Sequence, residues 1–256
     1  MSDLEAVERA LTAWDRGARI VEPLGGNRNR LWRVRLASLD CVARRSVRPR
    51  PAVEWELELL EFLHRSGLRV CAPVRTSEGA RMVDGIVLLR WLEGEPPASE
   101  RDWRLVAETL RTLHRLTRAW PQRPGFCSAQ ELLTGTAGGD VDLALMPPDA
   151  VELCRAAWRA LAGEPLSVVH GDPCAANIRI AHGEVGLLDW DEARVDVSAL
   201  DFADLPIPPA ELRDPGRAFA LRRAADAWEA AAGWRAEPAY ARRRLARLSA
   251  ETGSHA

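Results

Sequence analysis

The pattern of apolar and polar positions predicts extended structure in the first third of the chain. Residues 20–36 form two extended runs joined by Gly25, Gly26 and Asn27, and residues 40–45 form a third run. Runs of this length, bounded by turn residues, are typical of β-strands. We therefore predict three consecutive strands, with a glycine turn between the first two.

A helix and a further strand are predicted next. Apolar residues recur at helical spacing over residues 52–64, while glutamates occupy other faces, which predicts an amphipathic helix. Residues 85–92 are almost continuously apolar, as expected of a buried strand. Residues 93–97 follow with Gly and Pro, a pattern typical of a hinge between two lobes.

Helices dominate the remainder of the chain. Three further stretches have helical periodicity, and Ser99 or Asp102 can cap the first of them. Residues 135–142, rich in Gly and Thr, are predicted to form a flexible loop. The predicted helices comprise residues 102–118, 151–161 and 218–232.

A group of polar residues follows a further predicted strand in the second half of the chain. The apolar run at residues 166–170 predicts a strand end, and Gly171 and Pro173 break it. Asp172 should therefore lie on a loop, with its carboxylate free to face a cleft. Residues 177–190 then predict a tight hairpin.

The predicted hairpin brings Asn177 and Asp189 to the same end, because Asn177 opens its first strand and Asp189 closes its second. Mg²⁺ prefers the carboxylate and carbonyl oxygens that these side chains supply. A carboxylate, an amide and a second carboxylate in this order suit ATP-dependent phosphoryl transfer, in which the first acid orients the attacking hydroxyl. Taken singly, each piece is also explained by an ordinary turn or a helix cap.

The segment from His170 to Asp191 resembles the aminoglycoside phosphotransferase and choline kinase family, whose pattern is H-G-D, then N, then D-x-D. The resemblance implies a protein-kinase-like α+β fold with two lobes. A small β-rich lobe that binds nucleotide would span residues 1–92. A mostly helical lobe for catalysis and acceptor binding would span residues 93–256.

The resemblance also implies roles for individual residues. Asp172 is expected to be the catalytic base, and Asn177 and Asp189 are expected to bind Mg²⁺, with Asp191 as a supporting acid at the metal site. Other residues of the family pattern are expected to be structural, namely His114, His170 and Asp201.

The same resemblance places the ATP-binding residues in the first lobe. The turn at Gly25, Gly26 and Asn27 corresponds to the phosphate loop, where backbone amides can approach phosphates closely. An ordinary hairpin turn explains these residues almost as well. The hinge residues expected to line the adenine pocket are Arg90, Trp91 and Leu92, and we favour packing for the indole ring.

The strand at residues 40–45 departs from the family pattern. Arg44 stands where the family has a phosphate-binding lysine, and the chain contains no lysine. The resemblance implies that Glu56 pairs with this cation. Because a planar guanidinium does not reproduce a point-charge ammonium, the change indicates either an arginine bias that the site has absorbed or weakened catalysis.

Composition narrows the class of protein. A net charge of −2 over 256 residues does not suggest a nucleic-acid partner, and no apolar run approaches transmembrane length. The start of the chain predicts an acidic amphipathic helix rather than a signal peptide. The five cysteines are scattered, which is typical of reduced thiols in a cytoplasmic protein.

Charge gives a weak indication about the phosphate acceptor. Residues 205–256 hold six acids and nine arginines, a balance that argues weakly against a polycationic acceptor. It is neutral toward a sugar, an amino alcohol or an anionic metabolite. The arginines at residues 242–247 are expected to form a solvated helix face.

Together these features predict a cytoplasmic kinase that uses Mg²⁺ and ATP to phosphorylate a hydroxyl of a small molecule. The alternative is a nucleotide-binding pseudokinase with a regulatory role, in which Arg44 marks lost chemistry. A protein that shares only the fold and binds no nucleotide is a third possibility. ATP versus GTP, and monomer versus dimer, are left open by the sequence.

Overall fold

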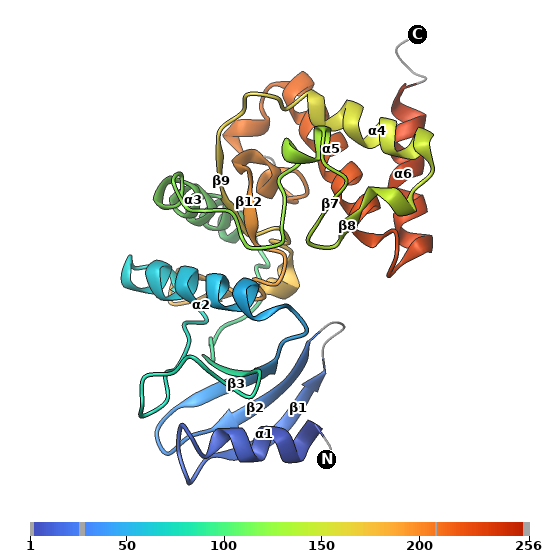
Figure 1. Ribbon diagram of the computed structural model, residues 1–256. Helices are drawn as coiled ribbons and strands as arrows, with labels where there is room; N and C mark the ends of the chain where they lie inside the picture. Colours follow the sequence, from blue (N-terminus) through green and yellow to red (C-terminus); the bar gives the residue numbers. More distant parts are fainter. Residues whose placement is uncertain (1–2, 26–28, 208, 253–256) are drawn as a thin grey trace. The chain divides into compact units, whose positions relative to one another are not determined.

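The computed structural model of the chain divides into two compact units, each built from two stretches of sequence. The structure describes residues 3–25, 29–207 and 209–252. The first unit comprises Met1–Glu95 and Arg179–Leu188, and the second comprises Pro96–Ile178 and Asp189–Ala256. In Figure 1 the first unit is mostly blue to teal and the second is mostly green to red.

The first unit is built on a five-stranded antiparallel sheet with the order β1-β2-β3-β6-β5. Buried and half-buried positions alternate along the middle of β2, as expected of a strand with one face on a core. The strands predicted between the start of the chain and the hinge are confirmed. They are β1 (Arg19–Gly25), β2 (Arg30–Arg35), β3 (Asp40–Arg45) and β6 (Ile86–Arg90), joined at the edge by β5 (Met82–Val83).

Two helices complete the main part of the first unit. Helix α1 (Asp3–Leu11) packs its buried Val7 and Leu11 against apolar residues of β2, β3 and β6. Helix α2 (Arg50–Arg65) follows β3, and Pro51 lies in its first turn, where the fixed φ of proline suits a helix. Both helices were predicted from their apolar spacing.

A second sheet of the first unit has three strands in the order β10-β11-β4. The hairpin strands β10 (Ile178–Ala181) and β11 (Glu184–Leu187) are joined by His182 and Gly183, which both have positive φ. The predicted hairpin is therefore confirmed, with shorter strands. Strand β11 also pairs in parallel with β4 (Arg69–Val70), which the sequence did not predict.

The second unit begins with α3 (Glu100–Leu116), which starts with a capping box. Ser99 Oγ accepts a hydrogen bond from the Asp102 N–H, and the Asp102 carboxylate accepts one from the Ser99 N–H. Helix α3 packs against β9 (Leu166–Val169), which pairs antiparallel with β12 (Arg194–Val197). The loops that leave this two-stranded ladder carry the candidate site.

Three helices form the rest of the second unit, and α5 (Pro215–Gly233) packs against both α4 (Pro148–Arg159) and α6 (Pro238–Thr252) (Figure 1). Trp158 is fully buried and donates from its indole N–H to the Ala224 carbonyl at 3.3 Å, which ties α4 to α5. The helices predicted at residues 151–161 and 218–232 are confirmed as α4 and α5, and both begin a few residues earlier than expected.

The prediction of a flexible loop at residues 135–142 is wrong. Strands β7 (Ala137–Gly138) and β8 (Val141–Asp142) form a short hairpin there. The Gly139 N–H at its turn donates to the Gly125 carbonyl at 2.7 Å. Gly and Thr content therefore misled the prediction, because distant backbone partners fix this segment.

Short 3-10 turns connect the elements of the second unit. They are η1 (Glu131–Leu133), η2 (Leu143–Leu145), η3 (Ala175–Asn177), η4 (Ser198–Phe202) and η5 (Ala210–Leu212). Of the helices in the described ranges, none is long and apolar enough to cross a membrane.

Candidate active site

One buried carboxylate anchors the loop that follows β9. Asp201, in η4, accepts hydrogen bonds from the backbone N–H of His170 at 2.9 Å and of Gly171 at 3.0 Å. Its Oδ2 also lies 2.8 Å from Nε2 of His114 in α3. Burial alone would raise the pKa of Asp201, but the hydrogen bonds from His114 and Gly171 hold that pKa below its ordinary value. The carboxylate therefore stays ionised and fixes the start of the loop.

Gly171 is required at the turn that comes next. Its φ is 92°, in the left-handed region, and a Cβ atom there would lie 2.8 Å from the carbonyl oxygen of Glu192. His170 is buried, and its ring centroid lies 4.9 Å from that of Trp190. The loop is thus packed tightly up to Gly171 and becomes exposed at Asp172.

Asp172 and Asn177 are in direct contact. Asn177 Nδ2 donates to Asp172 Oδ2 at 2.8 Å and to the Asp172 backbone carbonyl at 3.0 Å. Asn177 ends η3 rather than opening a strand, so its predicted position was one residue off. Because the amide nitrogen of Asn177 contacts Asp172, its amide oxygen is the atom that can ligate a metal ion.

Asp189 and Asp191 lie in a turn that a buried arginine organises. Nη1 of Arg123 donates to the backbone carbonyls of Trp190, Asp191 and Ala193 at 3.1, 2.9 and 3.1 Å. Asp189 is exposed with a φ of 52°, whereas Asp191 is buried. A positive φ in a non-glycine residue is uncommon, so the surrounding contacts must hold the turn in this form.

The chemistry of the predicted metal ligands fits Mg²⁺. Asn177 directly precedes β10 and Asp189 follows β11 by two residues, so both flank the same end of the hairpin. Among the described residues, no three His, Cys, Asp or Glu side chains gather as a metal cluster. An amide and carboxylates suit a Mg²⁺ ion whose other ligands are water and phosphate oxygens. The assignment of these residues and of Asp191 stays a prediction.

In the first unit, Arg44 of β3 and Glu56 of α2 form a buried ion pair. Nη1 of Arg44 donates to Oε1 of Glu56 at 2.6 Å, and the two residues are 4% and 0% exposed. Glu61 of the same helix instead pairs with Arg81 nearer the surface, at 2.7 Å. An arginine therefore takes the place of the expected lysine in a pair with Glu56, and the nucleotide-binding role of the pair stays a prediction.

The glycine turn between β1 and β2 is described only in part. Gly25 ends β1 with a φ of 77°, a left-handed conformation that favours glycine. Gly26 and Asn27 lie outside the described residues. The proposed phosphate loop therefore stays a prediction from the sequence.

The expected hinge residues lie at the end of β6. The backbone N–H groups of Arg90 and Trp91 already donate to carbonyls of the first unit, at 2.9 and 3.1 Å. The guanidinium of Arg33 lies 4.6 Å from the Trp91 ring centroid, in agreement with a packing role for this indole. Leu92 is half-buried beyond the strand. Contact of these residues with a base stays a prediction.

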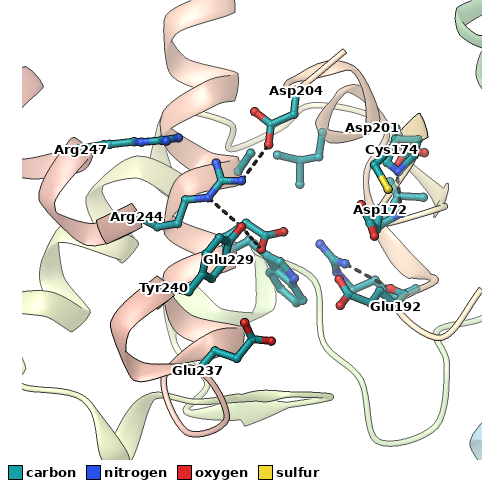
Figure 2. A pocket seen from close by; sticks show the side chains of 17 residues that line it. Asp172, Cys174, Glu192, Asp201, Asp204, Glu229, Glu237, Tyr240, Arg244 and Arg247 are labelled. Carbon is teal, nitrogen blue, oxygen red and sulfur yellow. Dashed lines mark hydrogen bonds and ion pairs between the residues drawn. The ribbon is translucent and has the colours of Figure 1, made fainter. Parts of the chain in front are cut away.

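A cavity of about 530 Å³ lies in the second unit, and Asp172 is on its wall (Figure 2). We call it the acid-lined cavity, because six acids and three arginines line it. The acids are Asp172, Glu192, Asp201, Asp204, Glu229 and Glu237, and the arginines are Arg194, Arg244 and Arg247. A positively charged ligand is favoured by this lining.

The arginines of this cavity are held mainly by carboxylates outside its lining, although Asp204 in the lining also contacts Arg244 at 3.4 Å. Arg244 Nη1 donates to Asp226 at 2.6 Å, and Arg194 Nε donates to the fully buried Asp196 at 2.9 Å. Arg247 also lies near Asp226, at 3.5 Å. The expected solvated helix face is therefore wrong for Arg244, whose half-buried side chain turns toward its partners.

Glu229 of α5 faces the acid-lined cavity beside the only tyrosine of the chain. The hydroxyl of Tyr240 donates to Glu229 Oε2 at 3.0 Å and accepts from Arg244 Nε at 2.9 Å (Figure 2). Burial raises the pKa of Glu229, and the negative charges of Asp172 and Asp204 add to this effect, although Tyr240 and Arg244 oppose it. A cation beside Glu229 would stabilise its ionised form.

Sequence reasoning missed Arg123, Glu229 and Tyr240 as candidate functional residues. Arg123 lies in a connecting segment with no recognisable motif, and only the folded chain brings it to the carbonyls of the Asp189–Asp191 turn. Glu229 was counted among the acids of the carboxy-terminal segment, but its position on α5 gave no sign that it faces Asp172. A single tyrosine in the chain was the only available signal for Tyr240.

Comparison with known proteins identifies the family and the fold of the chain. A model of the phosphotransferase enzyme family matches residues 19–245. A thermostable mutant of aminoglycoside phosphotransferase APH(4)-Ia, in a ternary complex with AMP-PNP and hygromycin B, is a structural neighbour with a TM-score of 0.73. It is 15% identical in sequence, and the match covers 98% of this chain and 99% of that one.

Two further neighbours are kinases. A microcompartment-associated aminopropanol kinase has a TM-score of 0.61 at 17% identity, over 96% of this chain and 94% of that one. An amicoumacin kinase in complex with AMP-PNP and Ca²⁺ has a TM-score of 0.61 at 14% identity, over 97% of this chain and 85% of that one. No curated protein sequence matches the chain. The predicted protein-kinase-like α+β fold is confirmed by these neighbours.

Proposed function

The chain belongs to the phosphotransferase enzyme family, and we propose that it transfers the γ-phosphoryl group of ATP to a hydroxyl of a small, positively charged molecule. The observation that carries the proposal is the position of Asp172 on the wall of the acid-lined cavity. Neighbours bound to AMP-PNP support the use of ATP.

Asp172 is the proposed catalytic base. The hydrogen bond from Asn177 at 2.8 Å holds one of its carboxylate oxygens. The other oxygen accepts the proton of the acceptor hydroxyl while the hydroxyl oxygen attacks the γ-phosphorus. The bond between the γ-phosphorus and the β–γ bridging oxygen breaks, and ADP leaves. Asp201 fixes the backbone of His170 and Gly171, so Asp172 is attached to a rigid part of the loop. Catalysis would then depend mainly on positioning and charge stabilisation.

Mg²⁺ would be held by the amide oxygen of Asn177 and the carboxylate of Asp189, with Asp191 as a supporting acid. The bound ion would neutralise charge on the phosphate oxygens. Arg123 contributes indirectly, because its contacts with three carbonyls keep the turn between the two acids in place.

Arg44 is proposed to contact the phosphates of ATP. Glu56 fixes its guanidinium in a buried pair, which reduces the side-chain entropy lost when phosphate binds. A guanidinium can bind two phosphate oxygens as a fork, so the site can keep a phosphate contact without a lysine.

The acid-lined cavity favours a hydroxylated amine as acceptor, against the weak indication from the charge count of residues 205–256. That count treated all arginines alike, whereas Arg244 is paired with Asp226 outside the cavity lining. It also left out four acids of the lining that precede residue 205, namely Asp172, Glu192, Asp201 and Asp204. Glu229 and Glu237 remain on the cavity wall and would bind an ammonium group. The kinase neighbour named for aminopropanol, an amino alcohol, supports this class.

The test is ATP turnover by the purified protein with Mg²⁺ and a panel of amino alcohols, aminoglycosides, neutral sugars and hydroxy acids. We expect phosphorylated product from hydroxylated amines. Asp172→Asn should lower kcat by about 100- to 10,000-fold, as expected for the loss of a general base. Asp149→Asn, at an exposed position in the first turn of α4, is the matched control and should leave kcat unchanged.

Two results would contradict this reading. Full turnover by Asp172→Asn would rule out Asp172 as the base, and preferred transfer to hydroxy acids would rule out a cationic acceptor.

A thermal shift with ATP tests the pseudokinase alternative, because a ligand at 100 times its Kd adds about 2.7 kcal/mol to the free energy of unfolding. For a chain of this size the expected rise in Tm is about 5–10 °C. A rise without turnover on any acceptor supports the pseudokinase.

A further inference from the structure

A second cavity of the second unit has the opposite charge. Its volume is about 400 Å³, and residues of α3, η4, the start of α5 and the segment before β9 line it. We call it the arginine-lined cavity, because four arginines and a single glutamate line it. The arginines are Arg111, Arg115, Arg118 and Arg217, and the glutamate is Glu164.

The glutamate does not neutralise this cavity. Glu164 Oε2 accepts from Arg217 Nη2 at 2.8 Å, so one acid is matched by one arginine. Arg111, Arg115 and Arg118 are spaced four and three residues apart, on α3 and the turn after it, which places them on one side of the helix. As far as the chain is described, neither Arg115 nor Arg118 pairs with a carboxylate.

The wall of the arginine-lined cavity also includes the anchor of the catalytic loop. His114 and Phe202 line the cavity, with ring centroids 5.4 Å apart. His114 Nε2 lies 2.8 Å from Asp201 Oδ2, and Asp201 lines the acid-lined cavity. One hydrogen bond therefore connects the walls of the two cavities.

We propose that the arginine-lined cavity is a second ligand site, which binds a phosphate group or a small phosphomonoester. Guanidinium groups bind phosphate oxygens through charge-assisted hydrogen bonds. A volume of about 400 Å³ is within the range of ligand pockets and has room for an organic group beside the phosphate. The site uses no residue that we assign to ATP, Mg²⁺ or the acceptor, so it stands independently of the proposed function.

Isothermal titration calorimetry on the full chain, without nucleotide and in a phosphate-free buffer, tests the proposal with inorganic phosphate and glycerol 3-phosphate as probes. Saturable binding of one equivalent is expected. The double variant Arg115→Gln/Arg118→Gln should weaken it by about tenfold or more, since each arginine supplies a charged hydrogen bond. Both side chains are exposed, so the fold should be retained.

Arg101→Gln is the matched control, because Arg101 is an exposed arginine of α3 that does not line the cavity. Its affinity for phosphate should match that of the unsubstituted chain. Tighter binding of glycerol 3-phosphate identifies a phosphomonoester site, and equal binding shows that the phosphate group alone is recognised. The proposal is overturned if neither probe binds at millimolar concentration, if the double variant binds normally, or if Arg101→Gln loses as much affinity.

Discussion

The acid-lined and the arginine-lined cavities belong to the same unit and are connected through the His114–Asp201 hydrogen bond, yet their charges are opposite. One is lined by six acids and three arginines, and the other by four arginines and one glutamate. The net charge of the chain is only −2. Net charge is therefore no guide to the ligands of this protein, because the fold sorts the charges into separate cavities.

The two cavities also differ in how their charges are held. In the acid-lined cavity, Glu229 is half-buried and bonded to Tyr240, which in turn is bonded to Arg244. In the arginine-lined cavity, Arg115 and Arg118 are exposed. Desolvated, hydrogen-bonded charges select a ligand by geometry, whereas exposed charges attract it more generally. The acid-lined cavity should therefore be the more selective of the two.

The largest effect is expected at Asp201, which lines the acid-lined cavity and is hydrogen-bonded to His114 of the arginine-lined cavity. Asp201→Asn replaces a carboxylate that accepts from His170, Gly171 and His114 by an amide with one acceptor oxygen. Breaking this buried pair should cost about 3 kcal/mol of unfolding free energy. Thermal melting should therefore show a Tm about 6–12 °C lower.

The control for this change lies three residues further on. Asp204→Asn alters an exposed carboxylate of the same segment that contacts Arg244 at 3.4 Å, and surface changes of this kind usually stay within about 0.5 kcal/mol. Equal melting temperatures for the two variants would show that Asp201 does not anchor the loop. The His114–Asp201 hydrogen bond would then be no structural connection between the two cavities.

The contrast between the cavities also shows which parts of the candidate site can be predicted from the sequence. Asp172 was placed correctly on the loop after β9, because strand and turn signals surround it. Asn177 and Asp189 were predicted to open and close the hairpin strands, and they lie just outside β10 and β11. Glu229 reaches the cavity only through the packing of α5 against α4 and α6, which leaves no local pattern. Charge counting along residues 205–256 cannot show which arginines are paired with acids, since pairing is decided by the fold.

A smaller effect should come from the acid-lined cavity alone. Glu229→Gln keeps the size of the side chain but removes the charge that would bind an ammonium group. We expect the KM for a hydroxylated amine to rise about tenfold, the loss of one charged hydrogen bond, with the KM for ATP unchanged. Steady-state kinetics should show no such change for Glu152→Gln, on the exposed side of α4. A raised KM for ATP would instead point to a general disturbance of the unit.

The pH dependence of acceptor binding sharpens this assignment. Burial raises the pKa of Glu229, so its carboxylate is protonated at a higher pH than an ordinary glutamate. A raised pKa means that protonation of Glu229 stabilises the folded chain. This contribution to the free energy of unfolding is present below the pKa of Glu229 in the unfolded chain and is lost as pH rises through its pKa in the folded chain. For binding the sign is opposite, because an ammonium group needs the ionised form. The KM for the amine should therefore rise as pH falls, and Glu229→Gln should flatten that profile.

The smallest effect, and the one that compares the cavities directly, is the response to salt. Salt screens exposed charges more than half-buried ones, and the Debye length falls from about 10 Å at 0.1 M to about 3 Å at 1 M. Phosphate binding to the exposed Arg115 and Arg118 should therefore weaken severalfold over this range, whereas the KM for an amine held by Glu229 should change less. Calorimetry and kinetics in the same sodium chloride series measure both quantities. Equal salt slopes would mean that the burial of Glu229 gives it no advantage, and that both cavities bind through general attraction.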